Sequence, residues 1–558
     1  METLREQMLF LLDQNLYDSA DLLGCFLMSS MNSCTDLSPA ARAENLILYG
    51  DALYGKREYK RALSVYKQAL QQCRVGPKQS SSSGSRNTLQ IGSRSSSSPT
   101  NTPLINEHDV KFKIALCHLA VNDARSALSE MEGIPAKART LRITLTQARL
   151  YRITGYERAA IAFYKECLRQ CPYALEAIIA LAEMGVTQKE MQPQGQSKNT
   201  RLTSDHLDQV RWLQRYAEAH CAVACHDYKG GLEQLSQLGQ RFPNNLHLTL
   251  ETAKVEVALG KTGDAMHNFE KARQIDQFNI TAMDEYSLLL RSKSGHLEMN
   301  RLVNDLLDID VGRPEVWVAS AVYWDMREDK ERAAAYVDKS IRVEERHGLA
   351  YIVKGNIALS MNRPEAALSA FRKAQALKPD LRSYQGLVQA LLKIPKHKEA
   401  LFAARDAMKA MSHSAKALTL VGDVYAHIPD GREKARKFYE SALRLEPGYL
   451  GAVLALADLH VLEGRNNEAI ALLQKYLKNW TDDALHIKLA QILAATGKVG
   501  ESLKHFQIAL SMNPQNELAK KGLDRLEKQM KGVDPDALEE EENEVEDVDG
   551  DQQEEEFL

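Results

Sequence analysis

The sequence predicts an all-α, superhelical solenoid in which pairs of antiparallel helices stack one after another. Three observations lead to this fold class. A small residue, here called the marker, recurs about every 34 residues, a second small residue often stands twelve residues before it, and an aromatic ring often follows four residues after it. The markers are Ala265, Ala333, Ala367, Ala400, Ala435 and Ala469, with Met299 and Ser502 in the same register.

The spacing has a physical explanation in the clearest unit, around the marker Ala367. Gly355 and Ala367 are small because two antiparallel helices cross there, and the distance between helix axes depends on the side chains at the contact. Phe371 lies one turn beyond the marker on the same face, where it can fill the gap toward the next unit. Pro379 ends the second helix, since it lacks an amide donor. This is the tetratricopeptide-repeat pattern, and weaker copies bring the expected number to about twelve repeats.

Composition divides the chain into repeats, two insertions and a tail. The insertions are rich in Ser, Thr, Asn, Gln and Gly, and have too few apolar residues to form a core. We expect an N-terminal helical pair and first repeat at 1–73, a disordered Ser-rich insertion at 74–105, repeats at 106–186, a polar insertion at 187–206, repeats at 207–530 and an acidic disordered tail at 531–558.

Charge is distributed unevenly. The segment from Asp534 to Leu558 carries 14 acidic and no basic residues, which leaves 71 basic against 61 acidic residues in the rest of the chain. Repulsion between like charges extends such a tail, so it either solvates the protein or serves as an interaction tail. The body shows no basic stripe interleaved with aromatic residues, so we expect no nucleic-acid partner. No apolar run is long enough for a membrane span and no signal peptide is evident, which predicts a soluble intracellular protein without a membrane partner.

All eight cysteines fall before residue 226, a distribution that favours a reducing compartment over a disulfide framework. Cys167 and Cys171, like Cys221 and Cys225, are four residues apart on expected helices, so a metal site is conceivable. The spacing is not that of a zinc finger or ribbon, and cysteine is commonly a small buried residue. We therefore expect a packing role, with no metal and no cofactor.

Catalytic motifs are not recognisable in the sequence. The run Gly260-Lys261-Thr262 resembles the end of a phosphate-binding loop, but Val255 stands where that motif needs glycine, so Gly260 is expected to be a turn glycine. Because repeats fill almost the whole chain, no room remains for a catalytic domain. We expect a protein that is not an enzyme.

Two surfaces are candidates for protein binding. Repeats of this kind offer a concave groove lined by their first helices, and the lysine of a chaperone-tail clamp is replaced by Ile352, four residues before Asn356. Leucine-rich helices at the N-terminus are either a divergent end repeat or, as we favour, a self-association surface. The groove candidates are Asn356, Gln389, Asp423, Asp458 and Gln491, with Asp51 in the same position, and the dimerisation candidates are Leu11, Leu12, Leu16, Leu22, Leu23 and Phe26.

The order of segments resembles the subunit 7 family of the anaphase-promoting complex, a cell-cycle ubiquitin ligase. The resemblance rests on the leucine-rich start, one repeat from Leu46 to Gln71, the Ser-rich insertion, the run Tyr164 to Pro172, further repeats and the acidic tail. It implies a non-catalytic, homodimeric scaffold in the nucleus and cytoplasm, which stacks on related tetratricopeptide subunits during mitosis and cell division. Another tetratricopeptide adaptor, for a chaperone or a cargo, remains the alternative. Ser98 and Thr102, each followed by proline, are candidate phosphorylation sites, with an unmodified spacer as the alternative.

Overall fold

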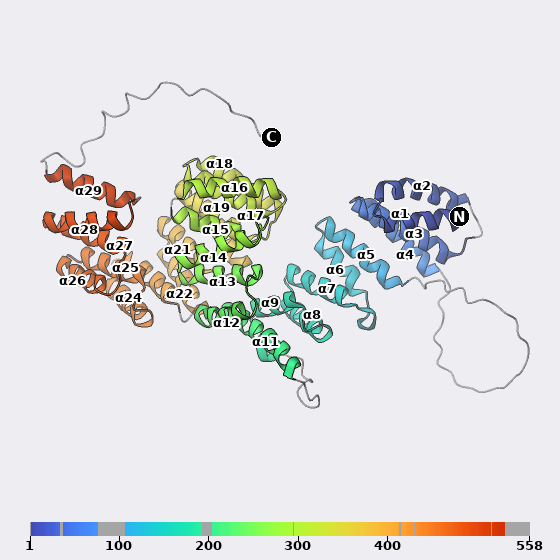
Figure 1. The fold of residues 1–558 in the computed structure, drawn as a ribbon, viewed down its shortest axis with the longest axis horizontal. Coiled ribbons are helices and arrows are strands. Elements are labelled where there is room, and N and C mark those ends of the chain that lie inside the picture. The colour runs from blue at the N-terminus through green and yellow to red at the C-terminus, as the bar shows by residue number, and fades with distance from the viewer. Residues whose placement is uncertain are drawn as a thin grey trace, which may run out of the picture. The chain divides into compact units, whose positions relative to one another are not determined.

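The computed structural model describes eight stretches of the chain and divides it into two compact units. The described residues are 2–33, 37–75, 106–191, 204–293, 295–411, 414–428, 430–514 and 516–530. Within them the ordered elements are α-helices and one short 3-10 helix, with no strand (Figure 1). The units comprise Met1–Ala224 and Cys225–Leu558. The all-α fold class predicted from the sequence is confirmed.

Helices of the first unit follow the chain in antiparallel pairs. They are α1 (Glu2–Asp13), α2 (Tyr17–Ser33), α3 (Pro39–Gly55), α4 (Tyr59–Val75), α5 (Glu107–Ala120), α6 (Ala124–Glu132), η1 (Ala136–Ala138), α7 (Leu141–Thr154), α8 (Glu157–Gln170), α9 (Leu175–Glu183), α10 (Gln188–Met191) and α11 (Ser204–Ala224).

The second unit continues in the same way. Its helices are α12 (Tyr228–Arg241), α13 (Leu246–Leu259), α14 (Thr262–Ile275), α15 (Met283–Ser292), α16 (His296–Ile309), α17 (Pro314–Met326), α18 (Lys330–Val343), α19 (Gly348–Ser360), α20 (Pro364–Leu377), α21 (Leu381–Lys393), α22 (His397–Ala410), α23 (Ala415–Ala426), α24 (Arg432–Leu445), α25 (Leu450–Leu462), α26 (Asn466–Leu477), α27 (Asp483–Ala495), α28 (Val499–Met512) and α29 (Glu517–Met530).

Tight turns join the two helices of a repeat. Gly260 follows α13 with φ of 83°, a left-handed conformation that glycine adopts without a steric penalty. The expectation that Gly260 is a turn glycine is thus confirmed. Between α19 and α20 the same left-handed turn is made by Asn362, and Pro364 begins the second helix, where its missing N–H costs nothing.

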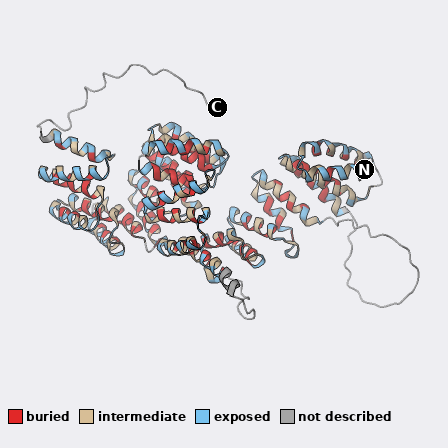
Figure 2. Ribbon diagram, in the orientation of Figure 1, coloured by how far each residue is buried: buried red, intermediate tan, exposed pale blue. Residues whose placement is uncertain are grey.

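Each helix buries a stripe of residues against its neighbours (Figure 2). The markers Ala265, Ala333, Ala367, Ala400, Ala435 and Ala469 are all fully buried. Phe371 is also fully buried and lies between Gly355 of α19 and Gly386 of α21, so that one ring joins two successive repeats. The expected close helix crossings are therefore present.

The predicted insertions fall only partly within the described residues. Residues 76–105, which contain Ser98 and Thr102, and the acidic tail 531–558 lie outside them. The polar segment 187–206 contains α10, and α11 begins at Ser204, earlier than the repeat start expected at residue 207. No helix among the described residues has the length and apolar character needed to cross a membrane.

Candidate protein-interaction surfaces

The first surface is formed by α1 and α2 at the start of the first unit. Helix α2 turns Ala20, Leu27 and Met31 inward, a spacing that keeps all three on one side of the helix. Gly24 lies on this side as well, because α2 approaches the ring of Tyr49 so closely that a Cβ would overlap it. The opposite side of α2 is therefore directed away from the core.

An ionic network holds α2 on the repeats that follow. The carboxylate of Asp21 is almost fully buried and accepts hydrogen bonds from the Lys56 ammonium at 3.0 Å and from the Arg61 guanidinium at 3.4 Å. Burial alone would raise the pKa of Asp21, but these two cations outweigh it and lower the pKa. Arg61 also donates to the hydroxyl of Tyr49 at 2.9 Å. One carboxylate thus ties α2 to α3 and α4.

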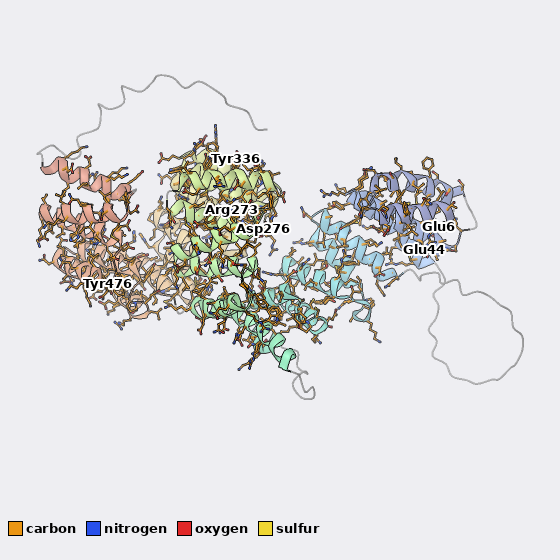
Figure 3. The ribbon with its side chains drawn as sticks, viewed as in Figure 1. Glu6, Glu44, Arg273, Asp276, Tyr336 and Tyr476 are labelled. Carbon is orange, nitrogen blue, oxygen red and sulfur yellow. The ribbon has the colours of Figure 1, made fainter. Side chains whose placement is uncertain are left out.

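A second ion pair fixes α1. The side chains of Arg5 and Glu44 lie 2.5 Å apart and join α1 to α3. Figure 3 labels Glu44 of α3 and, to mark α1, Glu6. Both helices of the N-terminal pair are therefore anchored through charged side chains as well as through their apolar faces.

The six dimerisation candidates divide into two sets. Leu11, Leu12 and Leu23 are partly buried and pack on the core of the first unit, so half of the predicted self-association residues are engaged within the chain. Leu16, Leu22 and Phe26 are exposed to 50%, 67% and 70%. With two further exposed side chains of α1 they form what we call the N-terminal apolar face, which comprises Leu9, Phe10, Leu16, Leu22 and Phe26.

Sequence reasoning missed Leu9 and Phe10. It counted leucines at helical spacing without deciding which side of α1 faces the repeats. Met8 is fully buried, and Leu4, Leu11 and Leu12 pack beside it. Since residues are 100° apart around a helix, Leu9 and Phe10 then fall on the outer side. A helical wheel would have identified them.

The groove candidates of the second unit differ in their environment. Asn356, Gln389 and Gln491 are exposed. Asp423 accepts a hydrogen bond of 2.8 Å from the hydroxyl of Tyr439, and burial raises its pKa although that hydrogen bond opposes the change. Asp458 is paired with Lys488. The two acidic candidates are thus engaged within the chain, and the three amides are available to a partner.

Asp51 of the first unit shows the same arrangement as Asp423. Its carboxylate accepts hydrogen bonds of 2.6 Å from the Tyr66 hydroxyl and from the Lys113 ammonium. All three side chains line a cavity of about 590 Å³ between α3 and α5. In both units a tyrosine therefore fills the helix crossing and also donates a hydrogen bond to a carboxylate in the groove.

The four cysteines of the two pairs differ in exposure, since Cys167 is buried, Cys171 and Cys221 are half-buried and Cys225 is exposed. Cys167 is fully buried, and burial raises the pKa of its thiol to about 11, which disfavours the thiolate that a metal requires. Cys221 donates to the backbone oxygen of Val186 at 3.6 Å. Among the described residues no group of three or more His, Cys, Asp or Glu side chains is arranged to hold a metal ion.

Comparison with known proteins places the chain in a family. The chain is 56% identical to anaphase-promoting complex subunit 7 of Arabidopsis thaliana over 543 residues, which cover 97% of each chain. The chain belongs to the anaphase-promoting complex subunit 7 family. Subunit 7 of Homo sapiens is 31% identical over 96% of this chain and 93% of its own length, and subunit 7 of Dictyostelium discoideum is 30% identical over 96% and 92%.

The fold of this subunit 7 family member also has a solved counterpart. A chain of the crystal structure of the APC/C hetero-tetramer Cut9–Hcn1 superposes with a TM-score of 0.56 over 94% of this chain and 96% of that chain. Their identity of 16% makes this a likeness of fold. The tetratricopeptide repeat family matches residues 322–382 and 432–492, which confirms the repeat type read from the marker spacing.

Proposed function

We propose that the chain works as a non-catalytic, homodimeric scaffold whose N-terminal apolar face contacts a second copy. As a member of the subunit 7 family, it is a scaffold subunit of the anaphase-promoting complex. Its partners are the other subunits of that complex, above all the related tetratricopeptide subunits, and it acts in the nucleus and cytoplasm during mitosis and cell division.

The observation that carries the dimer proposal is the exposure of five large apolar side chains on a firmly anchored helix pair. Phe26 is 70% exposed and Leu22, one turn earlier on α2, is 67% exposed. Large apolar side chains that are exposed to water are costly, and where several gather they commonly mark an interface. Two copies of the same face can cover each other across a two-fold axis, which is the commonest symmetry of protein dimers.

The scaffold proposal rests on the repeats. Three repeats contribute an exposed amide side chain on their first helix, namely Asn356, Gln389 and Gln491, while helix crossings of the repeats are filled by alanine, glycine and buried rings. Such a surface is suited to holding extended or helical segments of other proteins. A scaffold needs no reactive side chains, and we propose that ubiquitin transfer takes place on other subunits.

Affinity purification from dividing cells tests the assignment to the complex. The full chain should recover cullin-like and RING subunits together with other tetratricopeptide subunits. Recovery of chaperones or motor chains alone would instead identify an adaptor of the same fold and refute the scaffold proposal.

Light scattering tests the dimer. The variant L22D/F26D should have half the mass of the unaltered chain, because four carboxylates would be buried in the interface. Leu297 of α16 is 84% exposed but lies outside the N-terminal apolar face, so L297D is a matched control and should keep the dimer mass. An unchanged mass for L22D/F26D would contradict the proposal.

Point substitutions are a cleaner test than removal of Met1 to Ser30. That deletion would also remove Met8, Ala20 and Leu27, which are fully buried in the core of the first unit. A loss of mass could then report unfolding of the first repeat. Leu22 and Phe26 can be changed without opening that core, because both point away from it.

A further inference from the structure

Helices that are far apart in the sequence are joined by charged side chains within the second unit. Arg382, in the first turn of α21, donates from both terminal nitrogens to the two carboxylate oxygens of Glu285, at 2.7 and 2.9 Å. Glu285 lies in the first turn of α15, and 97 residues separate the two. The pairs α17/α18 and α19/α20 lie between them in the chain, so this contact skips two complete repeats.

The Arg382 side chain is held in place from its own helix as well. Its Nε donates to the carboxylate of Asp380 at 2.8 Å, and Asp380 forms a capping box with Ser383 that begins α21. Burial alone would lower the pKa of Arg382. The negative charges and hydrogen bonds of Glu285 and Asp380 outweigh burial, so the pKa of Arg382 is raised. The planar guanidinium therefore meets one carboxylate in a two-pronged geometry, which is the strongest form of ion pair.

Two further contacts connect other first helices across the repeats. His347, at the start of α19, lies 2.9 Å through Nε2 from the carboxylate of Asp284, the residue before Glu285. Lys416, in the first turn of α23, donates to the backbone oxygen of Ala258 at 3.0 Å, although 158 residues separate them. Ala258 lies at the carboxyl end of α13, where the helix dipole favours a cation.

Such contacts are unusual for the fold. In a solenoid each repeat touches only its neighbours, so curvature is the sum of small and independent rotations. The pairs Arg382 with Glu285 and Lys416 with Ala258 connect repeats that are not neighbours, and both lie on first helices, which line the concave side. An opening motion between any two repeats from α15 to α21 must therefore break the Arg382 contact.

We propose that Arg382 and Glu285 form a latch that holds the second unit at a fixed curvature and couples the repeats from α15 to α21 into one opening unit. The proposal rests on the scaffold function, because the latch would set the geometry at which partners are presented. It also means that this part of the concave surface is occupied by the chain's own side chains, and that a partner with an acidic segment must displace Glu285 to reach Arg382.

Hydrogen exchange of the full chain, measured by mass spectrometry, tests the latch without any partner. The variants are E285Q, R382Q and the double variant E285Q/R382Q. R382Q should speed exchange in both α21 and α15 by about tenfold, because opening no longer breaks the ion pair. The double variant should exchange little faster than either single variant, since both remove the same contact.

Arg372 and Glu399 provide the matched control. They join α20 to α22 at 3.2 Å, but their side chains are 59% and 48% exposed and they belong to adjacent repeats. R372Q/E399Q should leave exchange in α15 unchanged. The latch is overturned if R382Q leaves α15 unchanged, or if the effects of E285Q and R382Q simply add. Because no assembly is measured, a failed latch would leave the scaffold function intact.

Circular dichroism would reveal whether R382Q unfolds the second unit. In that case R382K is used instead of R382Q, because it keeps the positive charge but loses the two-pronged geometry. R382K should then give a smaller increase of exchange in both α15 and α21. No increase in α15 would again overturn the latch.

Discussion

A Cβ atom placed on Gly355 would lie 2.5 Å from Cζ of Phe371, so the ring occupies the space that any side chain at residue 355 would need. The same relation recurs in other repeats. Gly50 meets Tyr66, Gly422 meets Tyr439 and Gly522 meets Phe506, each within overlap distance of a Cβ. Pairs of a glycine and an aromatic ring thus set how closely successive helices approach.

Replacement of Gly355 should therefore destabilise the second unit. G355A should cost about 1–3 kcal/mol through overpacking, against which the better helix propensity of alanine returns up to about 1 kcal/mol. Urea denaturation followed by circular dichroism measures the difference. Gly263 of α14 has open space where its Cβ would be, so G263A should be neutral or stabilising. A G355A variant as stable as G263A would show that the crossing can relax without cost.

Removal of the Asp21 carboxylate should loosen the N-terminal helix pair. D21N removes the one buried carboxylate that pairs with both Lys56 and Arg61, and loss of hydrogen bonds between charged groups costs about 1.5–3 kcal/mol. Protease cleavage within α2 should become faster than in the unaltered chain. Asp18 lies on the same helix and also contacts Lys56, but its side chain is 87% exposed, so D18N is the control and should change little. Equal cleavage of the two variants would contradict the anchoring role of Asp21.

His347 should make stability depend on pH. Burial alone would lower its pKa, but the hydrogen bond and charge of Asp284 outweigh burial and raise the pKa above 6.5. The folded state then binds the proton more tightly than the unfolded state, so the stabilisation is complete below about pH 6.5 and is lost as pH rises through the folded-state pKa. The loss of melting temperature caused by H347Q should accordingly be larger at pH 5.5 than at pH 8.5.

His505 should show the opposite dependence. It lies 3.0 Å from His486 between the Nδ1 atoms, and burial lowers the pKa of both rings. Protonation then favours the unfolded state. The stability that the two neutral rings contribute to the fold is therefore present above about pH 6.5 and falls as the pH drops below that value. H505Q should therefore relieve a loss of stability at acidic pH. A uniform effect of H347Q and H505Q at all pH values would contradict both assignments.

Much of the fold could be predicted because small residues at fixed spacing have one physical use. Gly355 and Ala367 at this spacing indicate a close crossing of two helices, and Phe371, four residues after the marker, indicates which ring fills it. The spacing says nothing of residues far apart in the chain, and neither Glu285 nor Arg382 belongs to the repeat pattern. The candidate interaction surfaces were predicted only in part for the same reason, since exposure depends on which neighbour covers a helix.

The helix pairs and their order can be read from the sequence, because they depend on local packing rules that repeat along the chain, and the order of segments carries the family resemblance. The three-dimensional packing was needed to see that Leu11 and Leu23 pack inward while Phe26 stays exposed, that Asp423 is engaged by Tyr439, and that Arg382 reaches Glu285. The contact of Arg382 with Glu285 depends on the accumulated rotation of one repeat on the next. That rotation is set by many side-chain contacts together, and no single motif encodes it.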